Sequence, residues 1–414
     1  MTKGTDILIA RSKRAKTIQK ISRDAPILSM HVNMPGDTKN TPFTTIILNV
    51  FKRLVQSLYE TDVTSFESKD GDYALMRLSV DPYRVKKTMI YLEDNHPIGR
   101  FIDLDVYTHK QAISRQDLNL NKRPCFICGE NVNKCRRNQS HDFEALKTTI
   151  ENSVKKFLIT ALKKEASLAL RKEVYTYPCF GLVSHKNSGI HKDMNISHFL
   201  SAIDILEEAF ETYLNFGVHQ DFSLEILREQ GKLYELLLLK SINVNTYKGA
   251  HYLFGLFLPL FIQSIVNSED FDTFLNNLKA HAKQLETSDL KSINEAKTIG
   301  ESAYKTHKIR GIRGELSEGL PAIFNWYDST KSYSSKRMLY EIMARLDDTT
   351  LMKKDINTLK NVQKCIQAVL KNDTFDEQAT HCLNEKISPG GAADMLSLVY
   401  FLKQTDYLMA KRSP

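Results

Sequence analysis

The sequence has few cysteines, no long uninterrupted apolar run and no export signal that we recognise. Six cysteines in 414 residues are too few for a disulfide scaffold, so we expect reduced thiols. The first residues are charged and lack the apolar segment of a signal peptide, which predicts a cytoplasmic protein. The longest apolar stretch, residues 252–266, is interrupted by Gly255, Pro259 and Gln263 and is too short to span a bilayer. We therefore expect a buried helix there and no membrane partner.

The sequence also lacks the glycine-rich signatures of two common nucleotide-binding folds. It contains neither G-x-x-x-x-G-K-[ST] nor G-x-G-x-x-G, so it predicts neither a P-loop nor a Rossmann domain. No segment repeats at a fixed period, which argues against a solenoid. What the chain has in excess is positive charge, with a net charge of +8. That excess suits a nucleic acid, an acidic membrane or a phosphorylated small molecule, or it only keeps the surface soluble.

Local patterns divide the chain into two regions of different secondary structure. Strand-like runs occupy residues 27–32, 74–80, 87–92 and 101–107, and a helical pattern occupies residues 44–59. From residue 141 onward the apolar spacing is helical, at residues 146–174, 199–216, 222–239, 250–266, 271–285, 338–345 and 392–408. We therefore expect an α/β (α+β) domain over residues 1–155 and a larger all-α domain over residues 156–414.

The sharpest motif of the first region is the segment 99–106, with the sequence GRFIDLDV. Side chains alternate along a strand, so Asp103 and Asp105 are expected on one face. Two carboxylates on one face can share Mg²⁺, which prefers oxygen ligands and bridges to substrate phosphates. Gly99 would let the backbone approach a ligand closely, and Arg100 could bind a phosphate. The alternative is an exposed strand with two solvated aspartates.

A cluster of thiols follows, in the order Cys125-x2-Cys128-x6-Cys135-x5-His141. Three cysteines and a histidine suit a tetrahedral Zn²⁺ site, although the spacing is not that of a standard zinc finger. One alternative is a set of reduced, buried thiols. Another is a substrate-binding loop whose positive charge comes from three neighbouring arginines.

Five polar loops interrupt the helical region, and each combines glycine or small polar residues with an acid or a base. The carboxylates that could hold a metal ion or transfer a proton are Asp193, Glu315, Asp347, Asp348 and Asp394. The groups that could bind substrate or phosphate are His191, Asn245, Lys248, Arg313, Gly314, Ser388, Gly390 and Gly391. The last three open the final long helix, so its backbone N–H groups are expected to face a phosphate. Each loop alone is also explained as a helix cap or turn, but together they favour a nucleoside triphosphate site.

These segments together resemble two enzyme families. LIARSKRAKTIQ, LSMHVNMPGDTKNTP, GRFIDLDV and the RPCFIC segment resemble the citrate lyase holo-acyl-carrier-protein synthases, which are phosphoribosyl-dephospho-CoA transferases. EVYTYPCFGLVSHKNSGIHKDM, VNTYKGA, GIRGELSEGLP, MARLDDT and ISPGGAADML resemble the triphosphoribosyl-dephospho-CoA synthases. The motifs follow the family order and span nearly the whole chain, as in fusions of the two enzymes.

The resemblance implies two consecutive reactions that build and attach the prosthetic group of citrate lyase. The helical region would join ATP and 3′-dephospho-CoA with release of adenine. The first region resembles the nucleotidyltransferase fold and would attach phosphoribosyl-dephospho-CoA to a serine of the citrate lyase acyl carrier protein, releasing pyrophosphate. The resemblance makes Asp103 and Asp105 the expected Mg²⁺ ligands, and no nucleic-acid partner is expected. Within the helical region, an acid would protonate the leaving adenine and a carboxylate would deprotonate the attacking hydroxyl.

The helical region departs from the synthase pattern in three loops. After Asp347-Asp348-Thr349, the expected glycines and basic residue are replaced by Lys354-Asp355-Ile356. The usual P-K-P-G-L-V-D has Cys179, Phe180 and Ser184 in place of the lysine, the second proline and the aspartate. The usual T-G-G-V-N-T-H-K-G reads SINVNTYKG and lacks both of its first glycines. Three alternatives therefore stay open: an impaired synthase half that leaves mainly the transferase, an inactive scaffold for citrate lyase assembly, and a basic, zinc-containing nucleic-acid-binding protein.

Overall fold

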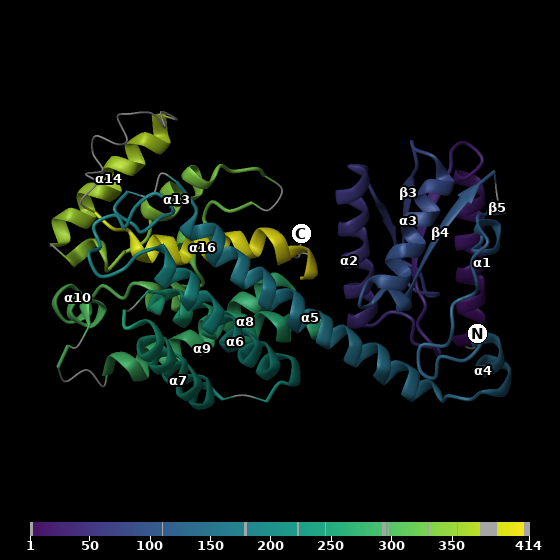
Figure 1. Cartoon of the computed structure of the whole chain (residues 1–414), viewed down its shortest axis with the longest axis horizontal. Coiled ribbons are helices and arrows are strands. Elements are labelled where there is room, and N and C mark those ends of the chain that lie inside the picture. The colour runs from purple at the N-terminus through teal and green to yellow at the C-terminus, as the bar shows by residue number, and fades with distance from the viewer. Residues whose placement is uncertain are drawn as a thin grey trace. The chain divides into compact units, whose positions relative to one another are not determined.

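A computed structural model describes residues 3–109, 111–177, 180–221, 223–244, 246–291, 295–296, 298–328, 331–353, 355–372 and 387–409. The chain divides into two compact units, residues 1–158 with 265–267 and residues 159–264 with 268–414. The division falls inside helix α5 (Phe143–Val174). The first unit combines helices with a small sheet and the second is helical, as the sequence predicts (Figure 1).

The first unit is built around one antiparallel sheet. Its elements before α5 are α1 (Lys3–Ile21), β1 (Ile27–Val32), α2 (Pro42–Tyr59), β2 (Thr64–Phe66), β3 (Tyr73–Arg77), α3 (Pro82–Asn95), η1 (Gly99–Phe101), β4 (Ile102–Thr108), β5 (Gln111–Ala112), η2 (Gln116–Leu118) and α4 (Val132–Asn138). The strands lie in the order β2-β3-β1-β4-β5. Three of the predicted strands correspond to β1, β3 and β4, and the helix predicted at residues 44–59 corresponds to α2.

The strand predicted at residues 87–92 is wrong, because this segment lies inside helix α3. The carboxylate of Asp81 accepts a hydrogen bond from the Arg84 N–H, and Pro82 occupies the first helical turn. An acidic N-cap followed by proline is a helix-start signal, which the apolar residues downstream obscured. The side chains of Val85 and Met89, four residues apart, are buried, as the helical period requires.

Helices cover both faces of the sheet (Figure 1). On one face Ile18 of α1 packs against Ile27, Tyr73 and Leu75 from β1 and β3. Helix α2 lies on the other side of the strands (Figure 1) and buries Ile47, among other apolar side chains. This arrangement leaves the apolar cluster under α1 on the same sheet face as the odd-numbered residues of β1 and β4.

Helix α3 covers the part of β4 that the short strand β5 does not pair. Strand β5 pairs with β4 only at Tyr107 and Thr108. Further along, Lys86 Nζ donates a hydrogen bond to Leu104 O at 2.9 Å, and Glu93 Oε1 accepts one from Leu104 N at 2.8 Å. Both charged side chains are buried. They satisfy backbone groups that would otherwise be left without partners at a sheet edge.

The second unit is a bundle of helices. Its elements after α5 are α6 (Ile196–His219), α7 (Leu224–Ile242), α8 (Lys248–Val266), α9 (Phe271–Lys291), α10 (Ile299–His307), α11 (Ile312–Glu318), α12 (Pro321–Phe324), α13 (Ser335–Met343), η3 (Leu351–Lys353), α14 (Ile356–Asn372), α16 (Gly390–Thr405) and η4 (Asp406–Leu408). Every predicted helix of this region overlaps one of these. Helices α10, α11, α12 and α14 were not expected, and α11 lies in a segment that the sequence predicts to be a polar loop. Helix α14 buries Leu359, Val362, Ile366 and Val369 at helical spacing.

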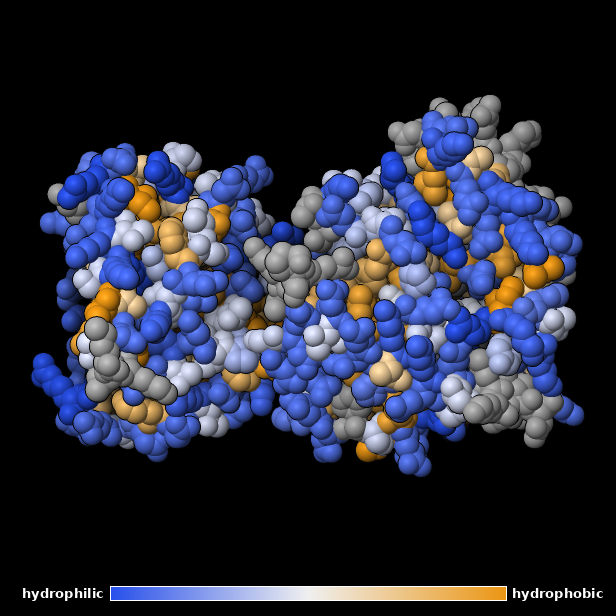
Figure 2. All heavy atoms as spheres, turned by 180° about the vertical axis from the view of Figure 1, so that it is seen from behind, coloured by the Kyte–Doolittle hydropathy of each residue, from blue (hydrophilic) through white to orange (hydrophobic). Residues whose placement is uncertain are grey.

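Helix α8 forms the centre of this bundle. It is long and apolar enough to cross a membrane, yet 83% of its most apolar window is buried inside the structure. Phe254, Phe257 and Phe261 of α8 are fully buried, and each ring contacts Phe401 of α16. Hydrophilic residues cover most of the face of each unit seen in Figure 2, with apolar residues in small separate spots. The prediction of a buried helix at this stretch is confirmed.

The expectation that all six cysteines are reduced is wrong. Cys365 of α14 is disulfide-bonded, whereas Cys125, Cys128 and Cys135 are free. The sequence could not show this, because a disulfide depends on which Cα atoms approach within about 7 Å, and that is set by the fold.

Candidate functional site

Strand β4 presents Asp103 and Asp105 on one face of the sheet. Ile102, Leu104 and Val106 are fully buried and alternate with the two partly exposed aspartates. The sheet register places Asp103 opposite His31 and Asp105 opposite Ser29 on β1. Both carboxylates therefore lie beside the buried apolar cluster under α1, on the same face of the sheet.

Each aspartate already has a cationic partner. The Arg123 guanidinium donates to the Asp103 carboxylate, and Lys86 Nζ lies 3.1 Å from Asp105 Oδ1. Burial raises the pKa of Asp103, while the charge of Arg123 opposes that rise. The two cations hold the carboxylates in place. Negatively charged oxygens are the ligands that Mg²⁺ prefers, so the donor set suits that ion.

A basic cluster near these aspartates was not singled out from the sequence. Arg11 and Arg14 of α1 donate to the buried Asp70 carboxylate at 3.0 and 2.6 Å, and these bonds lower its pKa although burial opposes them. His31 Nε2 lies 3.0 Å from Asp70 O. Burial, together with the charges of Arg14 and Lys39, lowers the pKa of His31. The signal was present, because these basic residues lie in the two stretches LIARSKRAKTIQ and LSMHVNMPGDTKNTP.

The structure places Gly99 and Arg100, which were predicted to contact a ligand, in contacts with the protein itself. A Cβ on Gly99 would lie 2.3 Å from Leu92 O, so glycine is needed there for packing against the end of α3. The Arg100 guanidinium donates to Pro124 O. Gly99 also begins a 3₁₀ turn, and the strand starts only at Ile102. Both residues therefore shape the start of β4 in this structure.

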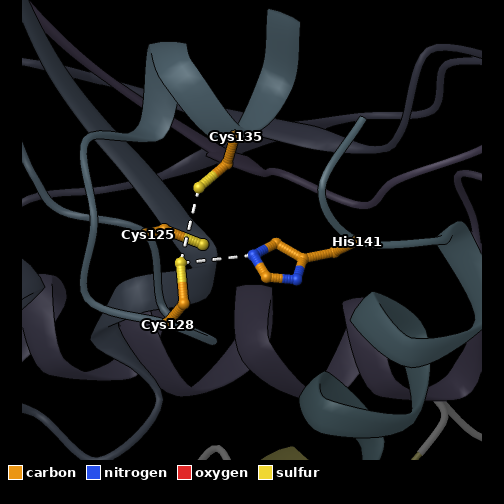
Figure 3. Close-up of side chains that lie close together, drawn as sticks. All are labelled: Cys125, Cys128, Cys135 and His141. Carbon is orange, nitrogen blue, oxygen red and sulfur yellow. Dashed lines mark hydrogen bonds between the residues drawn. The ribbon is translucent and has the colours of Figure 1, made fainter. Parts of the chain in front are cut away.

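The thiol cluster of the first unit converges on one point. The side chains of Cys125, Cys128, Cys135 and His141 turn toward one another, and Cys135 projects from α4 (Figure 3). Their four ligand atoms all lie within 4.8 Å of one another. Three thiols and one imidazole at such distances are a donor set that suits Zn²⁺.

The second unit contains a cavity of about 830 Å³. Most of the residues predicted for this unit line it: His191, Asp193, Lys248, Arg313, Asp347, Asp348, Ser388, Gly390, Gly391 and Asp394. A volume of this size is in the range of pockets that hold a nucleotide-sized ligand. Asn245, Pro178 and Cys179 lie outside the described residues.

Two predicted residues do not line this cavity within the described chain. Glu315 Oε2 accepts a hydrogen bond from Ala322 N at 2.9 Å at the start of α12, and burial raises its pKa to about 7. A Cβ on Gly314 would lie 2.7 Å from Arg310 Cβ, so this glycine is needed for packing. The sequence placed both in a substrate loop, because helix caps and ligand loops use the same residue types.

The start of α16 is capped by the protein itself. Asp348 Oδ2 accepts a hydrogen bond from Ala392 N at 2.9 Å, and Thr350 Oγ1 accepts one from Gly390 N at 2.8 Å. The backbone N–H of Gly391 also hydrogen-bonds to Asp348. The amides predicted to face a phosphate thus have protein acceptors. Local sequence could not reveal this, because the acceptors come from a loop about forty residues earlier.

Other predicted residues are brought together across the cavity wall. His191 Nε2 lies 3.0 Å from Ser388 Oγ, which joins two loops far apart in the sequence. Lys248 Nζ pairs with Glu235 of α7. Arg313 Nε lies 3.3 Å from Asp289 Oδ2, and its guanidinium stacks 4.9 Å from the centre of the Tyr252 ring. The cavity wall therefore holds its cations in defined positions beside carboxylates.

Two acids, Glu173 and the half-buried Asp394, face the same cavity, and Glu173 was missed. Glu173 is buried near the end of α5, and burial raises its pKa to about 8. Burial also raises the pKa of Asp394 well above its ordinary value, and the charge of Glu173 adds to the rise. Glu173 could have been noticed, because a glutamate in the last turn of a helix opposes the helix dipole. Such a pair holds at least one proton at neutral pH.

Comparison with known proteins identifies both halves of the chain. Residues 159–413 match the family model of ATP:dephospho-CoA triphosphoribosyl transferase. The chain belongs to this family. Residues 3–157 match the model of apo-citrate lyase phosphoribosyl-dephospho-CoA transferase. The two matches follow one another in the order that the sequence motifs indicate.

Fused relatives share this organisation. The chain is 28% identical to Protein CitXG of Haemophilus influenzae, over 89% of this chain and 88% of the relative. It is 26% identical to Protein CitXG of Leuconostoc mesenteroides subsp. cremoris, over 95% and 94%. It is also 26% identical to the 2-(5''-triphosphoribosyl)-3'-dephosphocoenzyme-A synthase of Haemophilus ducreyi, over 66% of this chain and 98% of that protein. The chain is thus a fused transferase of citrate lyase prosthetic-group synthesis.

Proposed function

We propose that the two units carry out successive transfers on one substrate. In the helical unit the ribose 2′-hydroxyl of 3′-dephospho-CoA attacks C1 of the ATP ribose, and adenine leaves. In the first unit a serine hydroxyl of the citrate lyase acyl carrier protein attacks the innermost phosphorus of the product, and pyrophosphate leaves. The observation that supports this most is the pair of acids with raised pKa values, Glu173 and Asp394, which line a cavity of nucleotide size.

The chemistry of the helical unit needs an acid and a base at one centre. The attacking hydroxyl loses a proton and the leaving adenine gains one, so a pair that shares a proton meets both needs. Glu173 and Asp394 form such a pair because their pKa values are both raised by burial. Lys248 and Arg313 lie on the same cavity wall and neutralise charge on the triphosphate. Asp193 and Asp347 are exposed to the cavity, where they could hold a cation bound to the phosphates.

The chemistry of the first unit is nucleotidyl transfer at the face of β4, in a fold that we propose is nucleotidyltransferase-like. Asp103 and Asp105 would hold Mg²⁺. This ion would neutralise the negative charge that develops on the departing pyrophosphate. Arg123 and Lys86 keep the two carboxylates in place. Arg14 and Lys39 lie close enough to His31 to lower its pKa. Their positive charges bind the phosphates of the substrate on the same sheet face.

The substituted positions of the helical half favour an active synthase over an impaired one. Tyr247, which replaces the usual histidine, is buried, donates to Leu170 O and packs edge-on against Phe199. Ser184, which replaces the usual aspartate, is buried, and its hydroxyl accepts from Lys186 N. Both side chains thus have partners within the protein fold. Burial raises the pKa of Tyr247 most, and the Glu173 and Asp394 carboxyls lie close enough to Tyr247 to add to that rise.

The whole proposal is tested by one mass-shift assay. Purified protein with ATP, Mg²⁺ and 3′-dephospho-CoA should release adenine. Addition of the apo acyl carrier protein should then raise the mass of that carrier by one phosphoribosyl-dephospho-CoA. A mass shift only with pre-made triphosphoribosyl-dephospho-CoA would mean that the helical unit is inactive, and no shift under either condition would reject the transferase. We further propose that residues 1–155 and 156–414 are the two functional domains of a cytoplasmic enzyme.

A further inference from the structure

The thiol cluster has the dimensions of a tetrahedral metal site. Cys128 Sγ lies 3.4 Å from Cys135 Sγ and 3.3 Å from His141 Nε2. Tetrahedral zinc with Zn–S bonds of about 2.3 Å separates its ligand atoms by roughly 3.5–3.8 Å, which is close to these two separations. A disulfide would bring two sulfurs to about 2.05 Å, and Cys125, Cys128 and Cys135 are all free.

The backbone around the first two thiols is already shaped for a metal ion. Cys125 N donates to Glu130 O at 2.7 Å, and Gly129 N donates to Cys125 O at 2.9 Å. Gly129 has φ +75°, a conformation that suits glycine and closes this turn behind Cys128. The backbone N–H groups of Ile127 and Cys128 hydrogen-bond to the Cys125 sulfur. Hydrogen bonds of this kind orient and stabilise a thiolate ligand.

The segment that contains the cluster has almost no apolar core of its own. Between residues 114 and 141, all of which are described, only Cys125 and Cys135 are buried. Helix α4 is seven residues long, too short to be stable through its own hydrogen bonds. A metal ion bound by four side chains is a cross-link, which stabilises a segment that lacks an apolar core. Four protein ligands leave no open coordination position, which is typical of structural zinc.

The same segment reaches the aspartate pair of the first unit. Arg123 lies two residues before Cys125, and it donates to Ile102 O at 3.1 Å and to the Asp103 carboxylate. Next to it, Pro124 O accepts a hydrogen bond from Arg100. The Phe126 ring packs edge-on against Phe101, with ring centres 5.4 Å apart. The residues flanking the thiols are therefore tied to the start of β4.

We propose that Cys125, Cys128, Cys135 and His141 bind one structural Zn²⁺, and that this ion holds Arg123 against Asp103. The zinc ion does not take part in the transfer itself. It orders the segment that supplies Arg123, which acts as a positioning residue for the Asp103 carboxylate. The effect on transfer rests on the proposed function of the first unit, whereas the zinc site itself does not.

Metal content tests the site directly. The full-length protein should contain one zinc per chain by mass spectrometry of its metals, and Lys134→Ala should retain it, because Lys134 is an exposed neighbour of Cys135 on α4. His141→Ala and Cys128→Ser should each lose most of the zinc. In the wild-type protein a mercurial reagent should release the zinc as the three thiols react. This measurement does not depend on the folding of any variant. A wild-type chain that neither contains nor takes up zinc, or that holds another metal, would overturn the assignment.

A second comparison tests the link to Asp103. Arg123→Ala should keep its zinc but attach the prosthetic group at least tenfold more slowly, and Arg123→Lys should recover part of that loss. His141→Ala should slow attachment to a similar extent, while adenine release by the helical unit stays unchanged and reports correct folding. Zinc loss in His141→Ala with a wild-type attachment rate would refute the coupling. Wild-type protein that binds zinc without any attachment activity would instead contradict the proposed function.

Discussion

The Asp394 carboxylate occupies the space that a side chain at position 249 would need. A Cβ on Gly249 would lie 1.9 Å from Asp394 Oδ2. The carboxylate also accepts a hydrogen bond from Ala250 N, at the start of α8. The positive end of the α8 dipole stabilises an acid in this position. Because Gly249 has no side chain, the Asp394 carboxylate has room to lie beside the cavity.

Substitution of Gly249 by alanine tests that relationship. The added methyl group must displace Asp394, so Gly249→Ala should slow adenine release at least tenfold and lower the Tm. Gly231→Ala is the control, because a Cβ there would meet only the Tyr213 hydroxyl, at 3.9 Å. Its Tm should stay the same or rise, since alanine favours a helix interior by about 1 kcal/mol. Wild-type adenine release by Gly249→Ala would show that the position of Asp394 does not matter.

Two neighbouring aspartates should behave in opposite ways. Both line the cavity, but Asp348 is buried and accepts hydrogen bonds from Thr350 and Ala392, whereas Asp347 is exposed. Asp348→Ala should therefore lower the free energy of unfolding by about 1–3 kcal/mol, because it leaves buried N–H groups without an acceptor. Asp347→Ala should leave the Tm unchanged and slow adenine release. Urea denaturation and an adenine assay on both variants check this, and equal loss of stability would contradict it.

The buried proton of Glu173 predicts how stability depends on pH. Burial raises the pKa of Glu173 to about 8, against about 4.3 in an unfolded chain. Between these values the native state holds a proton that the unfolded state has released, so stability falls as the pH rises. Glu173→Gln removes this loss, and its Tm relative to wild type should increase from about pH 5 to about pH 8. Calorimetry across that range is the measurement.

The control for this variant is a glutamate in water. Glu229 of α7 is exposed, and Glu229→Gln should keep a constant Tm difference from wild type over the same range. Glu173→Gln should in addition lose most adenine release, because glutamine cannot exchange a proton with the substrate. A pH-independent Tm difference for Glu173→Gln would mean that the carboxyl is ionised in the folded protein.

The sequence allowed most elements to be predicted, because apolar spacing is a local property. The alternation around Asp103 and Asp105 and the helical spacing of residues 250–266 both correspond to observed elements. The strand expected at residues 87–92 failed because its β-branched and apolar residues outweighed the cap at Asp81. At this segment the strand-like pattern and the N-cap followed by proline predicted different structures. The N-cap and proline predicted the observed helix.

Partners within the candidate sites were less predictable, because they come from distant segments. Gly390 and Gly391 have the composition of a phosphate loop, yet Thr350 and Asp348 take their amide groups. Glu173 is an ordinary glutamate in the sequence and becomes unusual only because the bundle buries it beside Asp394. Residue type and spacing indicated which loops meet at the cavity. They could not show which side chains form hydrogen bonds and ion pairs with one another there.

Asparagine at position 103 should separate the two reactions. Asp103→Asn keeps the size of the side chain but removes the charge that pairs with Arg123 and that would hold Mg²⁺. Attachment to the acyl carrier protein should fall at least a hundredfold, about 2.7 kcal/mol in the barrier, while adenine release stays at the wild-type rate. Asp62→Asn, at an exposed acid of the same unit, should change neither reaction. The mass of the carrier and the adenine released are measured in the same mixture. Equal loss of both activities would show that the aspartate pair serves the whole enzyme, and the assignment of one reaction to each unit would then fail.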